Sequence, residues 1–167
     1  MKSLVVFYSW TGNTEVTAKA LAAETGAELR FLKEEKKRRK ASGFLGAAFG
    51  ALTGSKSVLK DPDYNTDGYD VFFIGTPVWA MHSTPALNTW IQNSVFENRK
   101  VYLFITNASG REQRVIDSLA KRIRKKGGTV LGSFAIRTER NGKIDPEKVR
   151  SKVKNWVESQ NLKRTLK

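Results

Sequence analysis

A hydroxyl-rich loop near the N-terminus is the part of this chain whose residue types and spacing best suit a ligand. Backbone N–H groups at the start of a helix converge on an anion, and the helix dipole favours its negative charge. Hydroxyl side chains add donors, and glycine lets the backbone approach closely. The loop lies between an apolar run and a stretch with helical spacing, so it predicts a phosphate site formed by Ser9, Trp10, Thr11, Gly12, Asn13 and Thr14.

The same loop contains no lysine or arginine, so its phosphate would be held by neutral donors rather than by a point charge. This property points away from nucleoside triphosphates and towards a bound cofactor. The alternative interpretation is an ordinary strand-to-helix turn, in which the asparagine and threonine side chains only cap the helix.

Five apolar segments of strand length must position this loop. Residues 4–8, 71–75 and 101–106 are near-continuous apolar runs, which are typical of parallel strands buried on both faces. Residues 27–32 alternate instead, with Ala27, Leu29 and Phe31 on one side, which predicts an edge strand with one exposed face. Residues 129–136 form the fifth strand.

Amphipathic stretches with apolar residues three and four positions apart separate these strands and predict helices. Thr84-Pro85 and Asp145-Pro146 each place a capping residue before a proline. Ser109 and Glu112 have the spacing of a capping box.

The alternation of strands and helices, joined by right-handed crossovers, predicts an α/β fold. We expect a three-layer α/β/α sandwich around a five-stranded parallel sheet in the order 2-1-3-4-5. Residues 1–160 should form a single domain, followed by a short polar C-terminal tail over residues 161–167.

Composition excludes several kinds of chemistry. The 167 residues include no cysteine and one histidine, which rules out disulfides, thiol chemistry and cysteine-held iron–sulfur clusters and disfavours a histidine-based metal site. No apolar stretch is long enough to span a bilayer, and no signal-peptide pattern opens the chain. A cytoplasmic location is the expectation.

The chain is strongly basic, with a formal net charge of +14. Residues 111–167 hold 17 lysines and arginines against six acidic residues, and residues 33–40 add a second basic run. Such a surface attracts nucleic acid, anionic membranes or acidic proteins, or consists only of solvated helix faces. The run at residues 33–60 leads into apolar residues on one helical face, which suits packing on the sheet or contact with a membrane.

Ligands of open parallel sheets bind at the carboxyl ends of the strands near the switch point, so the loops at 9–14, 76–83 and 107–110 should converge. The second loop offers Trp79, on which a planar ring could stack, although a core tryptophan is the alternative. His82 could donate to a ligand or be an ordinary loop histidine. The third loop offers backbone amides for a ring edge.

With these three motifs in order at strand ends, the sequence resembles the flavodoxin family, in the branch that has Thr-Pro-Val-Trp after the third strand. The resemblance implies non-covalent FMN, with residues 9–14 around its phosphate. It also implies isoalloxazine contacts from Pro77, Val78, Trp79, Ala80, Met81, His82, Asn107, Ala108, Ser109 and Gly110.

Two features depart from the family pattern. Flavodoxins that act as low-potential shuttles are usually acidic, whereas this chain is basic, so its redox partner is expected to be acidic. Many relatives have glycine in the turn where this chain has Met81, and positive φ there is costly for a residue with a side chain.

Other α/β functions lack their required residues. A response regulator needs acidic residues where this chain has Ser9 and Trp10, and the segment at 50–57 lacks the Gly-Lys-Ser/Thr ending of a P-loop. A hydrolase elbow, Gly-x-Ser-x-Gly, does not occur.

Two functional hypotheses remain. The first is an FMN-binding protein of electron transfer, either a carrier or an FMN-dependent NAD(P)H or quinone oxidoreductase, in which no catalytic side chain is required. The second is a flavodoxin-like scaffold that binds nucleic acid or anionic surfaces through the basic helices around residues 121–126 and 148–154.

Overall fold

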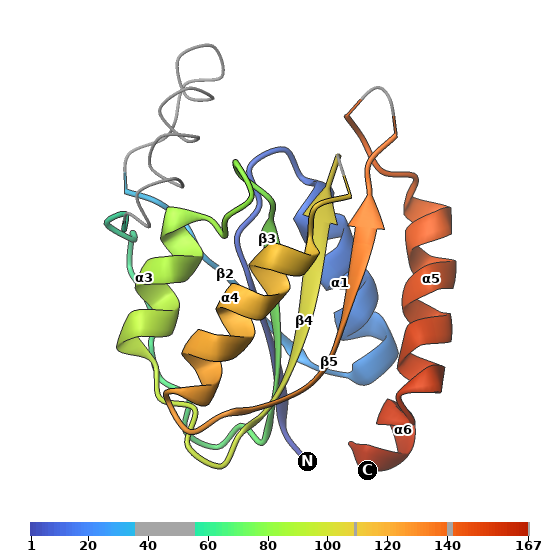
Figure 1. Cartoon of the computed structure of the whole chain (residues 1–167). Coiled ribbons are helices and arrows are strands. Elements are labelled where there is room, and N and C mark those ends of the chain that lie inside the picture. Colours follow the sequence, from blue (N-terminus) through green and yellow to red (C-terminus); the bar gives the residue numbers. More distant parts are fainter. Residues whose placement is uncertain (36–55, 109, 140–141, 167) are drawn as a thin grey trace.

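Five parallel strands form one sheet between two layers of helices (Figure 1). The computed structural model describes residues 1–35, 56–108, 110–139 and 142–166. The order β2-β1-β3-β4-β5 and the three layers confirm the predicted α/β sandwich. The strands are β1 Ser3–Phe7, β2 Glu28–Phe31, β3 Val71–Pro77, β4 Lys100–Asn107 and β5 Thr129–Arg137.

The helices divide between the two faces of the sheet. One apolar cluster joins one face to helices α3 and α4, and the second joins the other face to α1, α5 and α6. Their bounds are α1 Asn13–Thr25, α3 Pro85–Asn93, α4 Gln113–Arg124, α5 Pro146–Ser159 and α6 Leu162–Thr165.

Strand β1 shows why the central strands are continuous apolar runs in the sequence. Leu4 and Val6 pack in the cluster with α3 and α4, while Val5 and Phe7 pack in the cluster with α1 and α5. Side chains alternate across a strand, so both faces need apolar residues when helices cover both. Full burial of each such side chain stabilises the fold by about 1.5–3 kcal/mol.

Strand β2 is the edge strand that the alternation predicts, but its apolar face is incompletely covered. Leu29 and Phe31 on this face are 46% and 39% exposed. Phe31 stacks on Phe7 at 5.1 Å between ring centroids. Strand β2 lies at the edge of the sheet, and helix α1 does not extend far enough to cover the outer part of this face.

Two helix starts follow the predicted caps. The Thr84 side chain accepts a hydrogen bond from the Leu87 amide, and Asp145 accepts from the amides of Glu147 and Lys148. In both helices proline occupies the first turn, where its missing N–H costs no intrahelical hydrogen bond.

Helix α4 starts later than the capping-box spacing predicts. It begins at Gln113, with Glu112 in the cap position and no side-chain cap. The Asn107 side chain organises the preceding turn: its Oδ1 accepts from the Gly110 amide at 2.7 Å, and its Nδ2 donates to Glu112 at 3.2 Å. This use of the Glu112 carboxylate removes it from the reciprocal capping geometry. Ser109 lies outside the described residues.

The end of the chain is attached to the domain rather than extended as a polar tail. Residues 162–165 form helix α6, in which Leu162 is fully buried in the cluster below α5. The N-terminal amine donates to the Leu166 carbonyl at 3.0 Å. Both termini therefore lie at the end of the sheet opposite the carboxyl ends of the strands (Figure 1).

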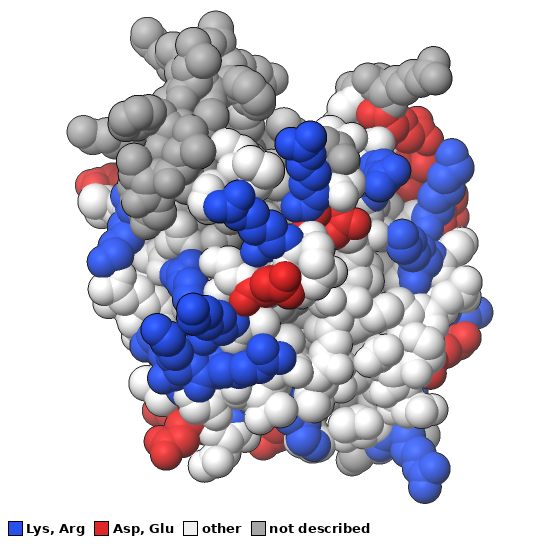
Figure 2. Space-filling model, in the orientation of Figure 1, with Lys and Arg blue, Asp and Glu red and all other residues white. Residues whose placement is uncertain are grey.

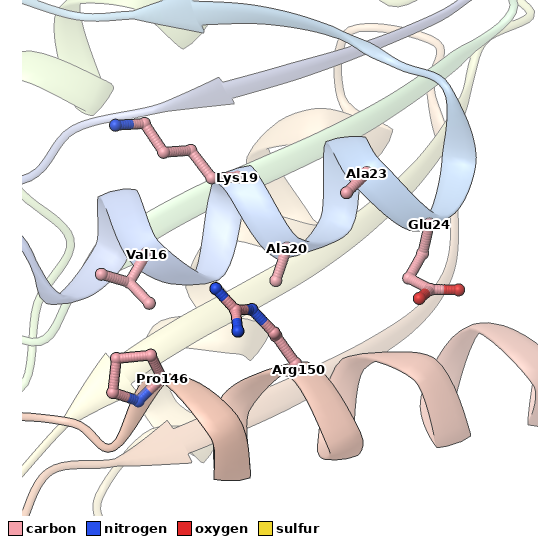
Figure 3. A pocket seen from close by; sticks show the side chains of 7 residues that line it. All are labelled: Val16, Lys19, Ala20, Ala23, Glu24, Pro146 and Arg150. Atoms are coloured by element: carbon pink, nitrogen blue, oxygen red, sulfur yellow. The ribbon is translucent and has the colours of Figure 1, made fainter.

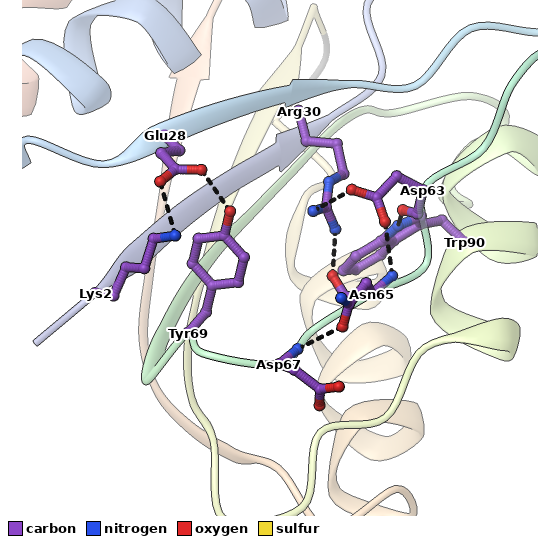
Figure 4. A network of polar contacts seen from close by, with 8 residues as sticks. All are labelled: Lys2, Glu28, Arg30, Asp63, Asn65, Asp67, Tyr69 and Trp90. Atoms are coloured by element: carbon purple, nitrogen blue, oxygen red, sulfur yellow. Dashed lines mark hydrogen bonds and ion pairs between the residues drawn. The ribbon is translucent and has the colours of Figure 1, made fainter.

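The segment that leads into β3 is tied to the edge of the sheet by polar contacts (Figure 4). Glu28 on β2 accepts a hydrogen bond from the Tyr69 hydroxyl and pairs with Lys2 at 3.0 Å. Arg30 donates to the Asn65 carbonyl at 2.6 Å and pairs with Asp63. The predicted amphipathic segment within residues 33–60 lies largely outside the described residues.

This network predicts a pH dependence of stability. The hydrogen bond from Tyr69, followed by that from Lys2, holds the pKa of Glu28 below its usual value. A carboxylate whose pKa is lowered on folding stabilises the fold above its unfolded pKa, and this stabilisation is lost as the pH falls through the folded pKa. The hydrogen bond to Glu28 raises the pKa of Tyr69, so that contribution is lost at alkaline pH instead.

Replacing Glu28 by glutamine should therefore lower the urea midpoint at neutral pH. The difference from the parent protein should shrink as the pH falls towards about 3, where carboxylates are protonated. Urea unfolding of both proteins across this range measures it, with Glu97→Gln as an exposed control. A difference that stays constant with pH would contradict the assignment.

Gly75 is required for the packing of the central strands. A Cβ at this position would lie 2.0 Å from Cζ of Phe104, whose ring covers the glycine from the neighbouring strand β4. Overpacking of this kind costs about 1–3 kcal/mol. Gly75→Ala should lower the free energy of unfolding by that amount in urea titration, whereas Ser118→Ala on the exposed side of α4 should change it by less than about 0.5 kcal/mol.

Candidate cofactor site

The predicted phosphate loop connects β1 to α1 at the carboxyl edge of the sheet. Gly12 occupies the cap position of α1 with φ of 91°, a conformation that favours glycine. Its carbonyl accepts from the Val16 amide at 3.0 Å, which starts the helix, and the Ser9 hydroxyl accepts from the Glu15 amide at 3.2 Å. These two hydrogen bonds fix the conformation of the loop where the helix starts.

The amides at the tip of this loop remain available. Across the described ranges of the chain, nothing accepts a hydrogen bond from the backbone amides of Thr11, Gly12, Asn13 or Thr14. Within 4 Å of the Cβ position of Gly12 there is no other atom, so the space above it is open. A row of unpaired N–H groups at a helix start, with open space beside Gly12, suits an anion.

Two of the loop side chains hold the loop in place rather than facing outward. The Thr14 hydroxyl is buried and lies 2.8 Å from the Thr106 hydroxyl at the end of β4. Asn13 donates from Nδ2 to the Gly142 carbonyl at 2.8 Å, which connects the loop to the segment before α5. Donors for an anion therefore come mainly from the backbone, with the exposed Thr11 hydroxyl beside them.

An aromatic cluster lies beneath the first two loops. Trp79 packs edge-to-face against Tyr8 and against Trp10, with ring centroids 5.6 and 5.5 Å apart. Trp79 is only 8% exposed, which differs from the expectation of an open stacking surface. Trp10 is half-buried, so the accessible aromatic ring of the pair belongs to the first loop.

A tight turn follows Trp79. Trp79 and His82 exchange both backbone hydrogen bonds, at 3.0 and 2.8 Å. The two residues between them, Ala80 and Met81, have φ of 46° and 65°, as the central residues of a type I′ turn require. Left-handed backbone at two adjacent residues with side chains stores strain, and such strain persists only where the surroundings over-determine it.

Buried hydroxyl groups supply that constraint at the two ends of the loop. The hydroxyls of Thr76 and Thr84 lie 3.2 Å apart, and the Thr84 amide donates to the Thr76 hydroxyl. The end of β3 and the start of α3 are therefore held together, and the residues between them must turn back within a short span.

A half-buried arginine supports the same loop from α4. Arg122 donates to both the side-chain and backbone oxygens of Asn88, and Ser83 donates to the same side chain at 2.7 Å. Burial lowers the pKa of the Arg122 guanidinium. Helices α3 and α4 are thus connected through Asn88 of α3, which also holds Ser83 of the turn-bearing loop.

Two residues that the motifs did not indicate lie beside the third loop. Gly110 has φ of 70°, and a Cβ there would lie 2.2 Å from Nη2 of Arg137, so this guanidinium lies directly over the loop. Thr138, whose amide donates to the Asn107 carbonyl at 2.8 Å, has a buried hydroxyl with no hydrogen-bond partner in the described structure. Arg137 ends β5 and Thr138 follows it, and no sequence motif there pointed to a ligand.

The three predicted loops therefore meet at one edge of the sheet. The Val78 amide donates to the Thr106 carbonyl at 2.9 Å, which joins the second loop to β4, and Thr14 joins the first. Arg111 contacts the Met81 sulfur at 3.9 Å, so cationic side chains border the loops. Ala108 is exposed beside them, while Ser109 is not described.

A separate groove of about 480 Å³ lies between α1 and α5 (Figure 3). Its apolar floor and charged rim differ from the polar loop cluster, and Arg150 extends from α5 towards α1. The lining residues are Val16, Lys19, Ala20, Ala23, Glu24, Pro146 and Arg150.

The described residues hold neither a cluster of metal ligands nor a membrane-spanning helix. This part of the chain contains no group of three or more histidine, cysteine, aspartate or glutamate side chains placed to hold a metal ion. It likewise contains no helix that is long and apolar enough to cross a membrane.

The comparison with protein families gives a direct match. The model described as Flavodoxin matches residues 51–160, two thirds of the chain. The chain belongs to the flavodoxin family. The matched range includes the second and third loops of this flavodoxin family member. The Ser9–Thr14 loop precedes it. No curated protein sequence gave a match.

Solved structures share the fold over nearly the whole chain. A candidate flavoprotein from Bacteroides eggerthii is 20% identical, with a TM-score of 0.72 over 96% of this chain and 98% of its own. A flavoprotein in complex with FMN from Lactobacillus acidophilus is 24% identical, with a TM-score of 0.63 over 80% and 92%. Oxidised flavodoxin 1 from Bacillus cereus is 18% identical, with a TM-score of 0.56 over 95% and 98%.

Because the turn is strained, an alanine-to-glycine substitution should have opposite effects on stability in the turn and in helix α1. Ala80→Gly should raise the free energy of unfolding by about 0.5–1 kcal/mol, because relief of the left-handed backbone exceeds the added entropy of the unfolded chain. Ala23→Gly, on the exposed side of α1, should lower it by about 0.5–1 kcal/mol. Urea titration measures both, and a loss of stability in Ala80→Gly would contradict the strain.

Proposed function

We propose that this protein binds FMN non-covalently and acts in electron transfer. The observation that carries this proposal is the convergence of the three loops at the carboxyl edge of β1, β3 and β4, with unpaired amides at Thr11–Thr14 and open space beside Gly12. Membership of the flavodoxin family supports it, as does the FMN-bound flavoprotein with the same fold.

The residues present fit such a cofactor in three respects. The unpaired amides of residues 11–14 suit a phosphate, because N–H groups at a helix start and the helix dipole favour negative charge. The Thr138 hydroxyl is buried without a partner at the edge of the third loop, where a polar ring edge could satisfy it. Trp10 in the first loop offers a half-buried aromatic ring, which packs edge-to-face against Trp79.

Each part of the chain has a separate task in this proposal. The backbone of residues 11–14 would hold the phosphate, and the turn at Ala80 and Met81 would present backbone groups to the ring. Thr76, Thr84 and the Arg122–Asn88 contact would fix that turn. Bound FMN supplies one- and two-electron redox chemistry, so no catalytic side chain is required.

The cations that border the loops should affect the redox properties. Arg111 and Arg137 lie against Met81 and Gly110, respectively. Positive charge close to the cofactor stabilises a reduced, anionic form, so we expect a less negative potential than an acidic relative would have. Steady-state turnover with NAD(P)H and a quinone would identify a reductase, whereas a carrier would need a separate reductase.

Titration of the cofactor-free protein with FMN, followed by flavin fluorescence, tests the proposal directly. Saturable quenching is the expected result, with riboflavin binding at least about tenfold more weakly because it lacks the phosphate. Unchanged FMN fluorescence in a folded protein would contradict the proposal.

A matched pair of glycine variants tests the position of the phosphate. Gly12 and Gly26 lie at opposite ends of α1, both have positive φ, and neither has an atom within 4 Å of its Cβ position. Gly12→Ala and Gly26→Ala should therefore lose similar stability, about 1 kcal/mol each. Only Gly12→Ala should weaken FMN binding, by about tenfold. Equal affinities in the two variants would place the phosphate elsewhere.

A further inference from the structure

Ion pairs are distributed unevenly over this basic protein. On α5, Lys148 pairs with Glu139 and Asp145, and Arg150 pairs with Glu147. Other pairs lie on α1, on α6 and at the edge of the sheet around β2. Across the described ranges, no ion pair involves a residue of α4 or of the turn before it.

Helix α4 and the residues that flank it nevertheless carry a strong positive charge. Residues 111–126 contain seven lysines and arginines and two acidic residues. Arg114, Lys121 and Lys125 are exposed and lie seven and eleven positions apart, so they form one stripe along the helix. We call the exposed cations of this segment the α4 face: Arg111, Arg114, Lys121, Arg124 and Lys125.

The α4 face lies on one side of the molecule. Figure 2 shows lysine and arginine side chains gathered over the face that α4 covers, with few acidic groups among them. Since these charges have no intramolecular carboxylate partners in the described structure, their field extends into solvent.

This face is continuous with the candidate cofactor site. Arg111 contacts Met81 in the strained turn, and α4 begins at Gln113, three residues after Gly110 of the third loop. The N-terminal end of the α4 face therefore lies beside the loops, so a protein docked along the face would reach them at Arg111. Helix α5 packs on the opposite face of the sheet, and its cations are partly neutralised.

We propose that an acidic redox protein docks on the α4 face and exchanges one electron at a time with the flavin beside it. This inference rests on the proposed function. Redox encounters bury little surface, so they depend on electrostatic steering more than on an apolar interface. Unpaired cations around an electron-transfer site provide such steering for a partner with surface carboxylates.

The residue types favour a protein over nucleic acid. Residues 111–126 contain no aromatic side chain on which bases could stack. Asp117, held by Gln113 at 2.9 Å, places a carboxylate within the face. A phosphate backbone would meet repulsion there, whereas a protein surface can present a donor at that point and carboxylates around it.

Two forms of one acceptor test the sign of the partner's charge. Native cytochrome c is basic, and succinylation of its lysines makes it acidic. The FMN-loaded protein is reduced with a stoichiometric amount of dithionite, and stopped-flow absorbance follows the haem. Each event moves one electron from the reduced flavin to Fe(III), which becomes Fe(II). The acidic form should react about tenfold faster at low ionic strength, and salt should remove the difference.

Charge-reversal variants test the place of docking. Arg114→Glu with Lys121→Glu should slow the reaction with succinylated cytochrome c about tenfold. The control, Lys152→Glu with Lys154→Glu, changes the net charge equally on exposed positions of α5 and should change the rate by less than about threefold. Equal loss in both pairs, or faster reaction of the native acceptor, would overturn the proposal. Arg114→Gln with Lys121→Gln provides a milder variant with an intermediate effect.

Failure of the proposed function is distinguishable from failure of the docking surface. FMN titration of every variant reports whether the cofactor binds. Independently of flavin, fluorescence anisotropy with labelled poly-L-glutamate should show about tenfold weaker binding for the α4 pair than for the α5 pair. Tighter binding of a short DNA duplex than of poly-L-glutamate at about 0.15 M salt would overturn the choice of a protein partner.

Discussion

Burial of a parallel sheet on both faces is the constraint from which the rest of this structure follows. The central strands can exclude water only if helices cover each face, and parallel strands require crossovers that return to the same starting edge. All loops that follow the strands then emerge at one end. The hydroxyl-rich loop, the strained turn and the Asn107 turn are brought together by this topology, although they lie far apart in the sequence.

The turn at Ala80 and Met81 shows how the fold imposes a local conformation. Neither residue favours a left-handed backbone, yet the loop must return within the span set by the Thr76 and Thr84 hydroxyls. Trp79 completes the constraint because its ring is fixed between Tyr8 and Trp10. Rigid placement of this kind keeps backbone groups in position before any ligand arrives, which lowers the entropy cost of binding.

The sequence predicted the elements whose signals are local. The continuous apolar runs identified the buried strands, and Thr84-Pro85 identified a helix start, because each depends on neighbouring residues. The exposure of Leu29 and Phe31 depends on how far α1 covers the sheet edge, which no local pattern encodes. Likewise Arg137 and Thr138 lie beside the loops only because β5 pairs with β4. The burial of Trp79 reflects the two aromatic rings that enclose it.

The meeting of the chain ends also has a practical meaning. Met1 and Leu166 are joined by a hydrogen bond at the end of the sheet remote from the loops, and Leu162 anchors the last helix in the core. A tag or tether at either terminus would leave the opposite pole facing solution, so the protein could be immobilised with its loops presented outward. A short linker could also join the two ends, which permits a circularly permuted chain opened at an exposed turn.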